Sequence, residues 1–335
     1  MAKIAINGLG RIGRAALKII MNRQELEITA VNDLIPPDNL AYLLRYDTVY
    51  GKYERNVQYE NDALVIDNKR IAVYNAKDPV ELPWKQLGVD IVLECTGIFT
   101  SKEDLQKHIK AGAKSVLLST TSKSEDVGTV VVGVNDATGD ARIISCASCT
   151  TNCITPVVEI MGRRIGIKKA ILTTIHAYTS TQKIVDSPSK KFRRGRAGAA
   201  NLVPTTTGAA VATTKALPQY LNKFDGIAVR APVPDGSLSD LTFITSRSTS
   251  VDELRKIFKE EASSERYRGI VEATDDPIVS SDIIKNSHAS IIDLEMIQVV
   301  DGDLVKVLSW YDNEWGYANQ LIREAVRLSK NLYNR

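Results

Sequence analysis

Three features of this sequence could do chemistry: a cysteine, a histidine and a glycine-rich run. Cys149 lies in Ser-Cys-Thr-Thr-Asn-Cys, His176 follows 27 positions later, and Gly-Leu-Gly-Arg-Ile-Gly occupies residues 8–13. A thiolate is a strong nucleophile, and an imidazolium beside a thiol lowers the pKa of that thiol. A glycine run of this kind can bind a dinucleotide. Together they predict hydride transfer through a covalent intermediate on the cysteine sulfur.

The glycine run predicts a dinucleotide-binding loop. It has the spacing Gly-x-Gly-x-x-Gly and lies between an expected strand over residues 3–7 and an expected helix over residues 11–21. The glycines would permit a tight turn and close approach of the pyrophosphate, which would rest on the helix N-terminus. Asp33 lies twenty residues beyond Gly13, at the end of the second expected strand. A carboxylate there accepts hydrogen bonds from the ribose and repels a 2′-phosphate, which predicts NAD.

Each feature also has a simpler explanation. The glycine run could be a turn without a ligand, His176 alone could be structural, and Cys149 alone could be a small buried hydrophobic residue. A helix that begins near Thr150 would instead place Cys149 at its N-terminus, where the helix dipole favours a thiolate. Cys146, Cys149 and Cys153 lack the fourth ligand and the nearby histidine of a zinc site, so no metal is predicted.

Composition narrows the class of protein. The 335 residues are 44% hydrophobic and 25% charged, which is ordinary for a globular protein with two domains. The net charge of +3 is too small to indicate nucleic-acid binding. No apolar run approaches the roughly 20 residues of a membrane span, and we expect no signal peptide before the first strand. Three of the four cysteines crowd between 146 and 153, which suits a reducing compartment. We therefore expect a cytoplasmic enzyme.

The alternation of elements predicts the fold class. In the first 150 residues, short apolar strands alternate with helices, which predicts a Rossmann-type, doubly wound parallel sheet. The strands are expected over residues 3–7, 27–32, 71–74, 91–95, 115–119 and 129–134, and the helices over 11–21 and 102–111. After Cys149 the strands are longer and few helices separate them, which predicts an α+β domain on a mixed or antiparallel sheet.

The second half is expected to contain strands over residues 170–177, 226–231, 241–247 and 304–311, and helices over 151–161 and 319–332. The chain is thus an expected α/β protein with two domains. The NAD-binding domain would comprise residues 1–148 plus 313–335, closed by the last helix, and the catalytic domain residues 149–312. Residues 182–207 show little apolar periodicity and carry six basic residues, so this segment is expected to be functional or disordered.

Four runs resemble one family closely. They are Ile-Asn-Gly-Leu-Gly-Arg-Ile-Gly-Arg at 6–14, Ala-Ser-Cys-Thr-Thr-Asn-Cys at 147–153, Pro-Thr-Thr-Thr-Gly-Ala-Ala at 204–210 and Trp-Tyr-Asp-Asn-Glu-Trp-Gly-Tyr at 310–317. With them, the chain resembles the phosphorylating glyceraldehyde-3-phosphate dehydrogenases from end to end. The resemblance implies a homotetramer, in which the 182–207 loop lines the cofactor pocket of a neighbouring subunit.

The resemblance also implies a role for each site residue. Cys149 would be the nucleophile and His176 its base. Thr179 and Arg230 would hold the phosphate of glyceraldehyde 3-phosphate. The attacking inorganic phosphate would be bound by Ser148, Thr150, Arg194, Thr207 and Gly208. NAD would be contacted by Gly8, Gly10, Arg11, Ile12, Gly13, Asp33, Lys77, Ser119 and Asn313, the last at the nicotinamide amide.

Some alternatives and departures from the family pattern remain. Erythrose-4-phosphate dehydrogenase uses the same cysteine and histidine but releases its product with water. A binding function for RNA or a partner protein would rest on the basic cluster at residues 190–196 alone. Cys146 replaces a usual asparagine, and Val211 replaces a usual lysine. We expect Cys146 to be a buried small residue, and a reversible Cys146–Cys149 disulfide is the alternative.

Overall fold

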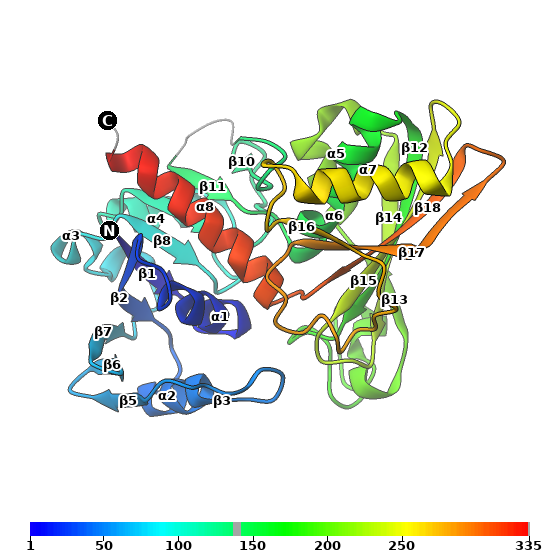
Figure 1. Cartoon of the computed structure of the whole chain (residues 1–335). Helices are drawn as coiled ribbons and strands as arrows, with labels where there is room; N and C mark the ends of the chain where they lie inside the picture. Colours follow the sequence, from blue (N-terminus) through cyan, green and yellow to red (C-terminus); the bar gives the residue numbers. More distant parts are fainter. Residues whose placement is uncertain (137–141, 334–335) are drawn as a thin grey trace. The chain divides into compact units, whose positions relative to one another are not determined.

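The computed structural model describes residues 1–136 and 142–333, and its contacts divide the chain into two compact units (Figure 1). The first unit comprises Met1–Val130, Asp136–Ala147 and Ala318–Arg335, and the second comprises Val131–Asn135 and Ser148–Tyr317. None of the described helices combines the length and the apolar composition that crossing a membrane requires.

The first unit is built on a nine-stranded sheet of order β10-β11-β9-β8-β1-β2-β7-β6-β5. Its parallel part runs from β10 to β7, and β6 and β5 extend it as antiparallel strands. The strands are β1 (Ala2–Asn7), β2 (Leu26–Asn32), β5 (Val57–Glu60), β6 (Ala63–Ile66), β7 (Lys69–Tyr74), β8 (Ile91–Glu94), β9 (Ser115–Leu118), β10 (Gly128–Thr129) and β11 (Ile143–Ser145). The helices are α1 (Arg11–Ile20), α2 (Pro37–Arg45), α3 (Trp84–Leu87), α4 (Lys102–Lys110) and most of α8 (Trp315–Tyr333), with a small β3 (Tyr46–Asp47) and β4 (Gly51–Lys52) ribbon.

The strand order places a switch point beside β1. The chain passes from β1 to its neighbour β2 on one side, and β8 later pairs with β1 on the other side. Ligands of doubly wound sheets bind outside the carboxyl ends of the strands at such a point. The glycine run at residues 8–13 follows the carboxyl end of β1 directly, so the topology positions it for a nucleotide.

The second unit is built on a seven-stranded mixed sheet of order β13-β14-β12-β15-β18-β17-β16. Its strands are β12 (Ile167–Ala177), β13 (Val203–Thr206), β14 (Phe224–Ala231), β15 (Ser237–Thr245), β16 (Val271–Thr274), β17 (Ser290–Val300) and β18 (Leu304–Tyr311). The helices are α5 (Cys149–Arg164), α6 (Ala209–Ala216) and α7 (Val251–Ser263). Apolar side chains of α5 and α7 form one buried core with the inner faces of β12, β15, β17 and β18.

The predicted Rossmann-type sheet and the mixed-sheet second domain are confirmed, but some elements were predicted wrongly. The strand expected over 129–134 ends at Thr129, because Gly133 adopts a φ of 81° and the Asn135 side chain accepts a hydrogen bond from the Val131 amide. The expectation of few helices in the second half missed α7. That helix begins at the N-cap Ser250, whose hydroxyl accepts from the Glu253 amide, a signal present in the sequence.

Candidate active site

Cys149 is the first residue of helix α5. The preceding Ser148 is the N-cap, and its hydroxyl accepts a hydrogen bond from the Thr151 amide at 3.1 Å. Serine is a preferred N-cap because it satisfies an amide that has no partner within the helix. The local sequence therefore begins the helix at the cysteine, as predicted, and directs the helix N-terminus toward its sulfur.

The fold brings His176 to this cysteine. The Cys149 Sγ lies 3.4 Å from the His176 Nε2. Alternate side chains of β12 point to the same face of the sheet, and Leu172, Thr174 and His176 are its buried set. That face packs against α5, so the period of the strand and the start of the helix together create the pair.

Arg230 lies on the other side of the His176 ring. It is the register partner of His176 in the parallel pair of β12 and β14. Its Nη1 lies 2.5 Å from the His176 Nδ1 and donates to the Ala177 carbonyl at 2.9 Å. The same Nδ1 lies 2.7 Å from that carbonyl oxygen, so the imidazole and the guanidinium both adjoin one backbone oxygen.

Tyr311 packs against the His176 ring of the Cys149–His176 pair, and the sequence analysis did not identify it. Its hydroxyl is hydrogen-bonded to the Thr150 and Thr174 hydroxyls, both at 2.9 Å. Its ring meets the His176 ring edge-on at a centroid distance of 6.0 Å. The alternation of buried residues along β18 ends at Tyr311, and this is the signal that could have found it. The Thr150 hydroxyl is therefore hydrogen-bonded within the protein.

Burial keeps both reactive groups neutral in this structure. Loss of solvent outweighs the opposing effects of the positive Arg230 and the Thr150 amide and raises the pKa of Cys149 to about 11. Loss of solvent and, to a smaller extent, the positive Arg230 together lower the pKa of His176 to about 3. The helix N-terminus alone does not produce a thiolate here, because desolvation of the sulfur outweighs it.

The other phosphate-binding candidates also lie in the second unit, and they are Thr179, Arg194, Thr207 and Gly208. The Arg194 Nε donates to the Thr205 hydroxyl at 3.0 Å, and the positive charge of Arg194 also lowers the pKa of His176. The Thr179 hydroxyl pairs with that of Thr181 at 2.9 Å. The Thr207 hydroxyl accepts from the Ala209 amide, and Gly208 is the exposed N-cap of α6.

The glycine run has the geometry of a dinucleotide cradle. Gly8 has a φ of +92°, and a Cβ there would lie 2.8 Å from the Thr96 nitrogen. A Cβ at Gly13 would lie 2.0 Å from the Gly8 carbonyl oxygen, whereas one at Gly10 would meet nothing within 4 Å. Gly10 is the N-cap of α1 and supplies no side-chain cap. The space beside Gly10 at the start of α1 is therefore open, which fits a pyrophosphate at the helix N-terminus.

Asp33 lies beside this cradle, directly after β2. Its Oδ2 accepts a hydrogen bond from the Leu9 amide at 2.6 Å, and its Oδ1 accepts from the Ile35 amide at 3.0 Å. These bonds hold the carboxylate against the glycine run, where a ribose would approach. Arg11 forms an ion pair with Asp47 at 2.6 Å.

The remaining cofactor candidates follow strand ends. Lys77 is exposed after β7, and the amide of Ser119 donates to the Glu94 carbonyl after β9. Asn313 follows β18 in the second unit, and its Oδ1 accepts from the Ser237 hydroxyl at 2.6 Å. That hydroxyl in turn accepts from the Ala177 amide at 3.1 Å. Asn313 is thereby tied to the residue after His176.

A buried polar network joins the strand ends that carry the cradle, and the sequence reasoning also missed it. The Asn7 side-chain amide donates to Glu94 Oε2 at 2.6 Å and accepts from Asn32 at 2.7 Å. His108 lies 3.1 Å from the same Glu94 oxygen, and Trp84 donates to its other ring nitrogen at 3.0 Å. These bonds tie β1, β2 and β8 together behind the glycine run.

The segment from 182 to 207 is ordered by its own hydrogen bonds. The buried Gln182 side chain donates to the Arg196 carbonyl at 2.7 Å, and the Ser187 amide donates to the Gly195 carbonyl at 2.8 Å. Within the basic cluster, Lys191 donates to the Thr206 hydroxyl, and Arg196 pairs with Asp186 at 2.8 Å. Several of its charges are therefore used to hold the loop.

Cys146 is buried in the first unit. The residue is 3% exposed, and burial, with Glu324 nearby, holds the pKa of its thiol well above the ordinary value. All four cysteines are free. These observations agree with a small buried residue in the place of asparagine. No group of three or more possible metal ligands occurs among the described residues.

Comparison with known proteins gives one consistent result. A family model described as "Glyceraldehyde 3-phosphate dehydrogenase, NAD binding domain" matches residues 2–102, and the model of the corresponding C-terminal domain matches residues 148–313. "Glyceraldehyde-3-phosphate dehydrogenase 2" of Streptomyces avermitilis is 46% identical over 98% of this chain and 99% of its own length. The Thermotoga maritima glyceraldehyde-3-phosphate dehydrogenase is 47% identical over 96% of this chain and 97% of its own length. The Zymomonas mobilis protein of the same name is 43% identical over 98% and 99%.

Proposed function

The chain belongs to the glyceraldehyde-3-phosphate dehydrogenase family, and from this premise we propose how its own residues carry out the reaction. The enzyme oxidises glyceraldehyde 3-phosphate with NAD in glycolysis and, as a phosphorylating member, forms 1,3-bisphosphoglycerate. The proposal for its site rests above all on the 3.4 Å contact between the Cys149 Sγ and the His176 Nε2. A nucleophile with a base in hydrogen-bond reach is the expected arrangement for covalent catalysis.

In the proposed sequence, the Cys149 thiolate attacks the aldehyde carbon and forms a thiohemiacetal. The His176 Nε2 then takes the proton from the thiohemiacetal hydroxyl, a contribution typically worth about 10²–10⁴-fold. NAD, when bound, accepts the hydride. The resulting Cys149 thioester keeps the energy of oxidation until inorganic phosphate attacks it. Cys149 and His176 are both shielded from solvent. A bound substrate or anion would therefore change the pKa difference that governs proton transfer between them.

Two arginines are proposed as the phosphate ligands. Arg230, with Thr179, would hold the phosphate of the substrate, and Arg194 would hold the attacking inorganic phosphate. Ser148, Thr150, Thr207 and Gly208 complete the proposed inorganic phosphate site. A guanidinium binds phosphate oxygens through two parallel N–H bonds, which a lysine cannot reproduce. In support, the buried Arg230 Nε has no hydrogen-bond partner within the described part of the chain.

The proposed NAD-binding residues are centred on the glycine run that follows β1. Gly8, Gly10 and Gly13 would accept the pyrophosphate at the start of α1, with Arg11 and Ile12 in its first turn. Asp33 would accept the ribose hydroxyls. Lys77, Ser119 and Asn313 would contact the rest of the dinucleotide. The open space at Gly10 and the carboxylate at the Leu9 amide support this assignment.

We expect a strong preference for NAD over NADP. A 2′-phosphate would meet the Asp33 carboxylate, and like charges in such a position cost several kcal/mol. Initial rates with each cofactor should therefore give a kcat/KM for NAD at least about a hundredfold higher, and Asp33→Ala should narrow that ratio. Equal values of kcat/KM for the two cofactors in the parent would contradict the role of Asp33.

The same assay tests the phosphorylating reaction itself. The parent should reduce NAD continuously only when inorganic phosphate, or arsenate in its place, is supplied with glyceraldehyde 3-phosphate. Turnover that is independent of phosphate and prefers erythrose 4-phosphate would indicate the water-dependent alternative.

Arg194→Gln should raise the KM for inorganic phosphate more than the KM for the aldehyde. This difference would separate the proposed site of Arg194 from that of Arg230.

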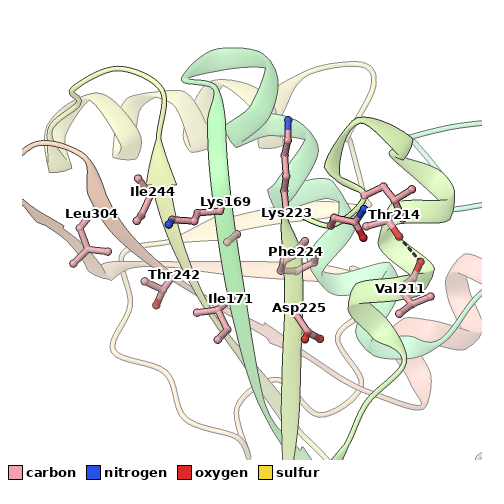
Figure 2. Close-up of a pocket in the computed structure, with 13 residues that line it drawn as sticks. Lys169, Ile171, Val211, Thr214, Lys223, Phe224, Asp225, Thr242, Ile244 and Leu304 are labelled. Atoms are coloured by element: carbon pink, nitrogen blue, oxygen red, sulfur yellow. Dashed lines mark hydrogen bonds between the residues drawn. The ribbon is translucent and has the colours of Figure 1, made fainter.

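We also propose a homotetramer, and the outer face of the second unit's sheet supports it. Ile171 on β12, Ile227 on β14 and Leu304 on β18 are 60%, 52% and 40% exposed on this face. Figure 2 shows Ile171, Thr242 and Leu304 around a hollow whose rim includes Val211. Val211, which stands where the family usually has lysine, adds a further apolar side chain. Exposed large apolar side chains gathered on one face, here with polar residues among them, are typical of an interface.

A charge on this face should break the assembly. Ile171→Lys would place an ammonium group in an apolar interface, where its desolvation is costly. We expect light scattering after gel filtration to give at most half the parent mass. Val80→Lys, which alters an exposed valine in the first unit, is the matched control and should keep the parent mass. An unchanged mass in Ile171→Lys would exclude this face as an interface.

Two further assignments are proposed. A cytoplasmic location is supported by the four free cysteines, of which Cys95, Cys146 and Cys153 have a raised pKa because of burial.

The two proposed domains would carry different steps of the reaction. NAD would be bound mainly by residues 1–148 and the closing helix, and acyl transfer would be carried out by residues 149–312.

A further inference from the structure

We propose that Ser237 is a positioning residue for the nicotinamide carboxamide of NAD, because it fixes the orientation of the Asn313 side chain. This inference rests on the proposed function, in which Asn313 meets the nicotinamide amide, and it deepens that function by naming the residue that orients Asn313. It starts from the 2.6 Å hydrogen bond that the Ser237 Oγ donates to the Asn313 Oδ1.

The sheet of the second unit brings Ser237 beside Asn313. Ser237 is the first residue of β15 and the register partner of Tyr311, the last residue of β18. Asn313 follows two positions after Tyr311, so the end of β18 carries it past the start of β15. Both residues are buried, with Ser237 0% and Asn313 4% exposed. A hydrogen bond in such surroundings is stronger than one in water, so it can hold a side chain in one orientation.

The backbone around Asn313 is fixed by the preceding Asp312. The Asp312 Oδ1 accepts hydrogen bonds from the Glu314 amide at 2.9 Å and the Trp315 amide at 2.6 Å. Its Oδ2 accepts from the Lys285 amide at 2.7 Å. These bonds close the turn between β18 and α8. The remaining freedom of Asn313 is therefore the choice between the two faces of its side-chain amide.

The single proton of the Ser237 hydroxyl decides that choice. The Ala177 amide donates to the Ser237 Oγ at 3.1 Å, so the hydroxyl already acts as an acceptor there. Its own proton needs an acceptor, and the Asn313 Oδ1 is the one that the described residues provide. The opposite amide orientation would turn Nδ2 toward the hydroxyl and leave a buried proton without a partner, which is costly. Ser237 thus directs the Asn313 Nδ2 away from itself.

The selected orientation presents a donor to a ligand. The Asn313 Nδ2 makes no hydrogen bond within the described part of the chain. An amide nitrogen of this kind only donates, so its counterpart on the cofactor is the carbonyl oxygen of the nicotinamide carboxamide. In the opposite orientation, Oδ1 would face that oxygen and two acceptors would repel each other. The hydroxyl of Ser237 therefore sets the sign of this contact.

The same hydroxyl also supports the strand end that carries the proposed base. Ala177, whose amide donates to Ser237, directly follows His176 at the end of β12. The base and the nicotinamide ring must both be placed relative to one substrate carbon, since the proton and the hydride leave the same group. Because Ser237 ties Ala177 to Asn313, its loss should lower kcat as well as weaken NAD.

The experiment compares binding of NAD with binding of ADP-ribose, which retains the adenosine, the pyrophosphate and the second ribose but lacks nicotinamide. Calorimetric titrations use protein from which cofactor has been removed. Ser237→Ala should weaken NAD about tenfold, as expected for one oriented hydrogen bond, and should change ADP-ribose by less than about twofold. 3-Acetylpyridine adenine dinucleotide, which keeps the carbonyl oxygen, should lose as much as NAD. Equal losses for NAD and ADP-ribose would overturn the proposal.

A double-mutant cycle tests the route through Asn313. In an Asn313→Ala background, Ser237→Ala should cause no further loss of NAD affinity relative to ADP-ribose, because the side chain that Ser237 orients is gone. Additive losses in the double variant would show that Ser237 does not act through Asn313, and they would also overturn the proposal.

Two further variants separate positioning from folding. Ser239→Ala is the matched control, since Ser239 is a buried serine on the same face of β15, and it should bind both ligands as the parent does. Ser237→Ala leaves the buried Ala177 amide without its acceptor, so thermal unfolding is measured for each variant. Ser237→Thr keeps the hydroxyl and should restore the preference for NAD over ADP-ribose. A folded Ser237→Thr that binds ADP-ribose but remains as weak toward NAD as Ser237→Ala would contradict the proposal.

Failure of the proposed function would be recognised separately. A parent protein that binds neither NAD nor ADP-ribose would contradict the assignment of the NAD site itself. A parent that binds both, together with a Ser237→Ala variant that retains the parent's preference between them, would contradict only the role of Ser237.

Discussion

Replacement of Cys149 by serine should abolish oxidation of glyceraldehyde 3-phosphate. The hydroxyl is a far weaker nucleophile than a thiolate at neutral pH and cannot form the thioester that preserves the oxidation energy. We expect the rate of NAD reduction to fall by roughly 10⁴-fold or more, which is typical for loss of a covalent nucleophile. Because only one atom changes at the first residue of α5, the fold and NAD binding should be retained.

Cys153→Ser is the matched control for this prediction. Cys153 lies one helical turn beyond Cys149, is buried, and directs its sulfur to the Ser309 hydroxyl at 3.3 Å. A serine there keeps hydrogen-bond partners, so activity should stay within a few-fold of the parent. NAD affinity by calorimetry and thermal unfolding would verify that both variants are folded. Substantial turnover by Cys149→Ser would refute the assignment of the nucleophile.

His176→Asn should have the second largest effect. Loss of the base removes the proton acceptor of the thiohemiacetal, and the rate of NAD reduction should fall by about 10²–10⁴-fold. The variant should also shift the pH dependence of the thiol. When His176 takes the thiol proton, its imidazolium stabilises the thiolate, so removal of the imidazole should move the apparent pKa of Cys149 upward.

The direction of this pKa shift can be measured from the rate of Cys149 alkylation as a function of pH. In the parent, the rate should already be high near neutral pH, and in His176→Asn it should rise only as the pH approaches the pKa of a buried thiol. His288→Asn is the matched control, because His288 pairs with Glu272 at 3.0 Å and makes no contact with the described residues of the site. Identical alkylation profiles for the parent and His176→Asn would show that the pairing is wrong.

The sequence by itself determined the local parts of the site. The serine before Cys149 is an N-cap, so the start of α5 follows from a preference that acts within one helical turn. The glycines at 8, 10 and 13 need only a strand before them and a helix after them. Alternating burial along β12 places His176 on the same face as Leu172. Each of these depends on neighbours close in the chain, and that is why it could be predicted.

The tertiary structure decided which of these local parts meet. Arg230 lies beside His176 because β14 pairs with β12 in one particular register, although the two residues are 54 positions apart. Tyr311 reaches the hydroxyls of both Thr150 and Thr174 because β18 pairs with β15 on the side away from β12. Register and strand order result from the packing of the whole core, which no short run of residues encodes. Desolvation is likewise a property of the assembled core, and it explains why a helix N-terminus that favours a thiolate holds a neutral thiol in this structure.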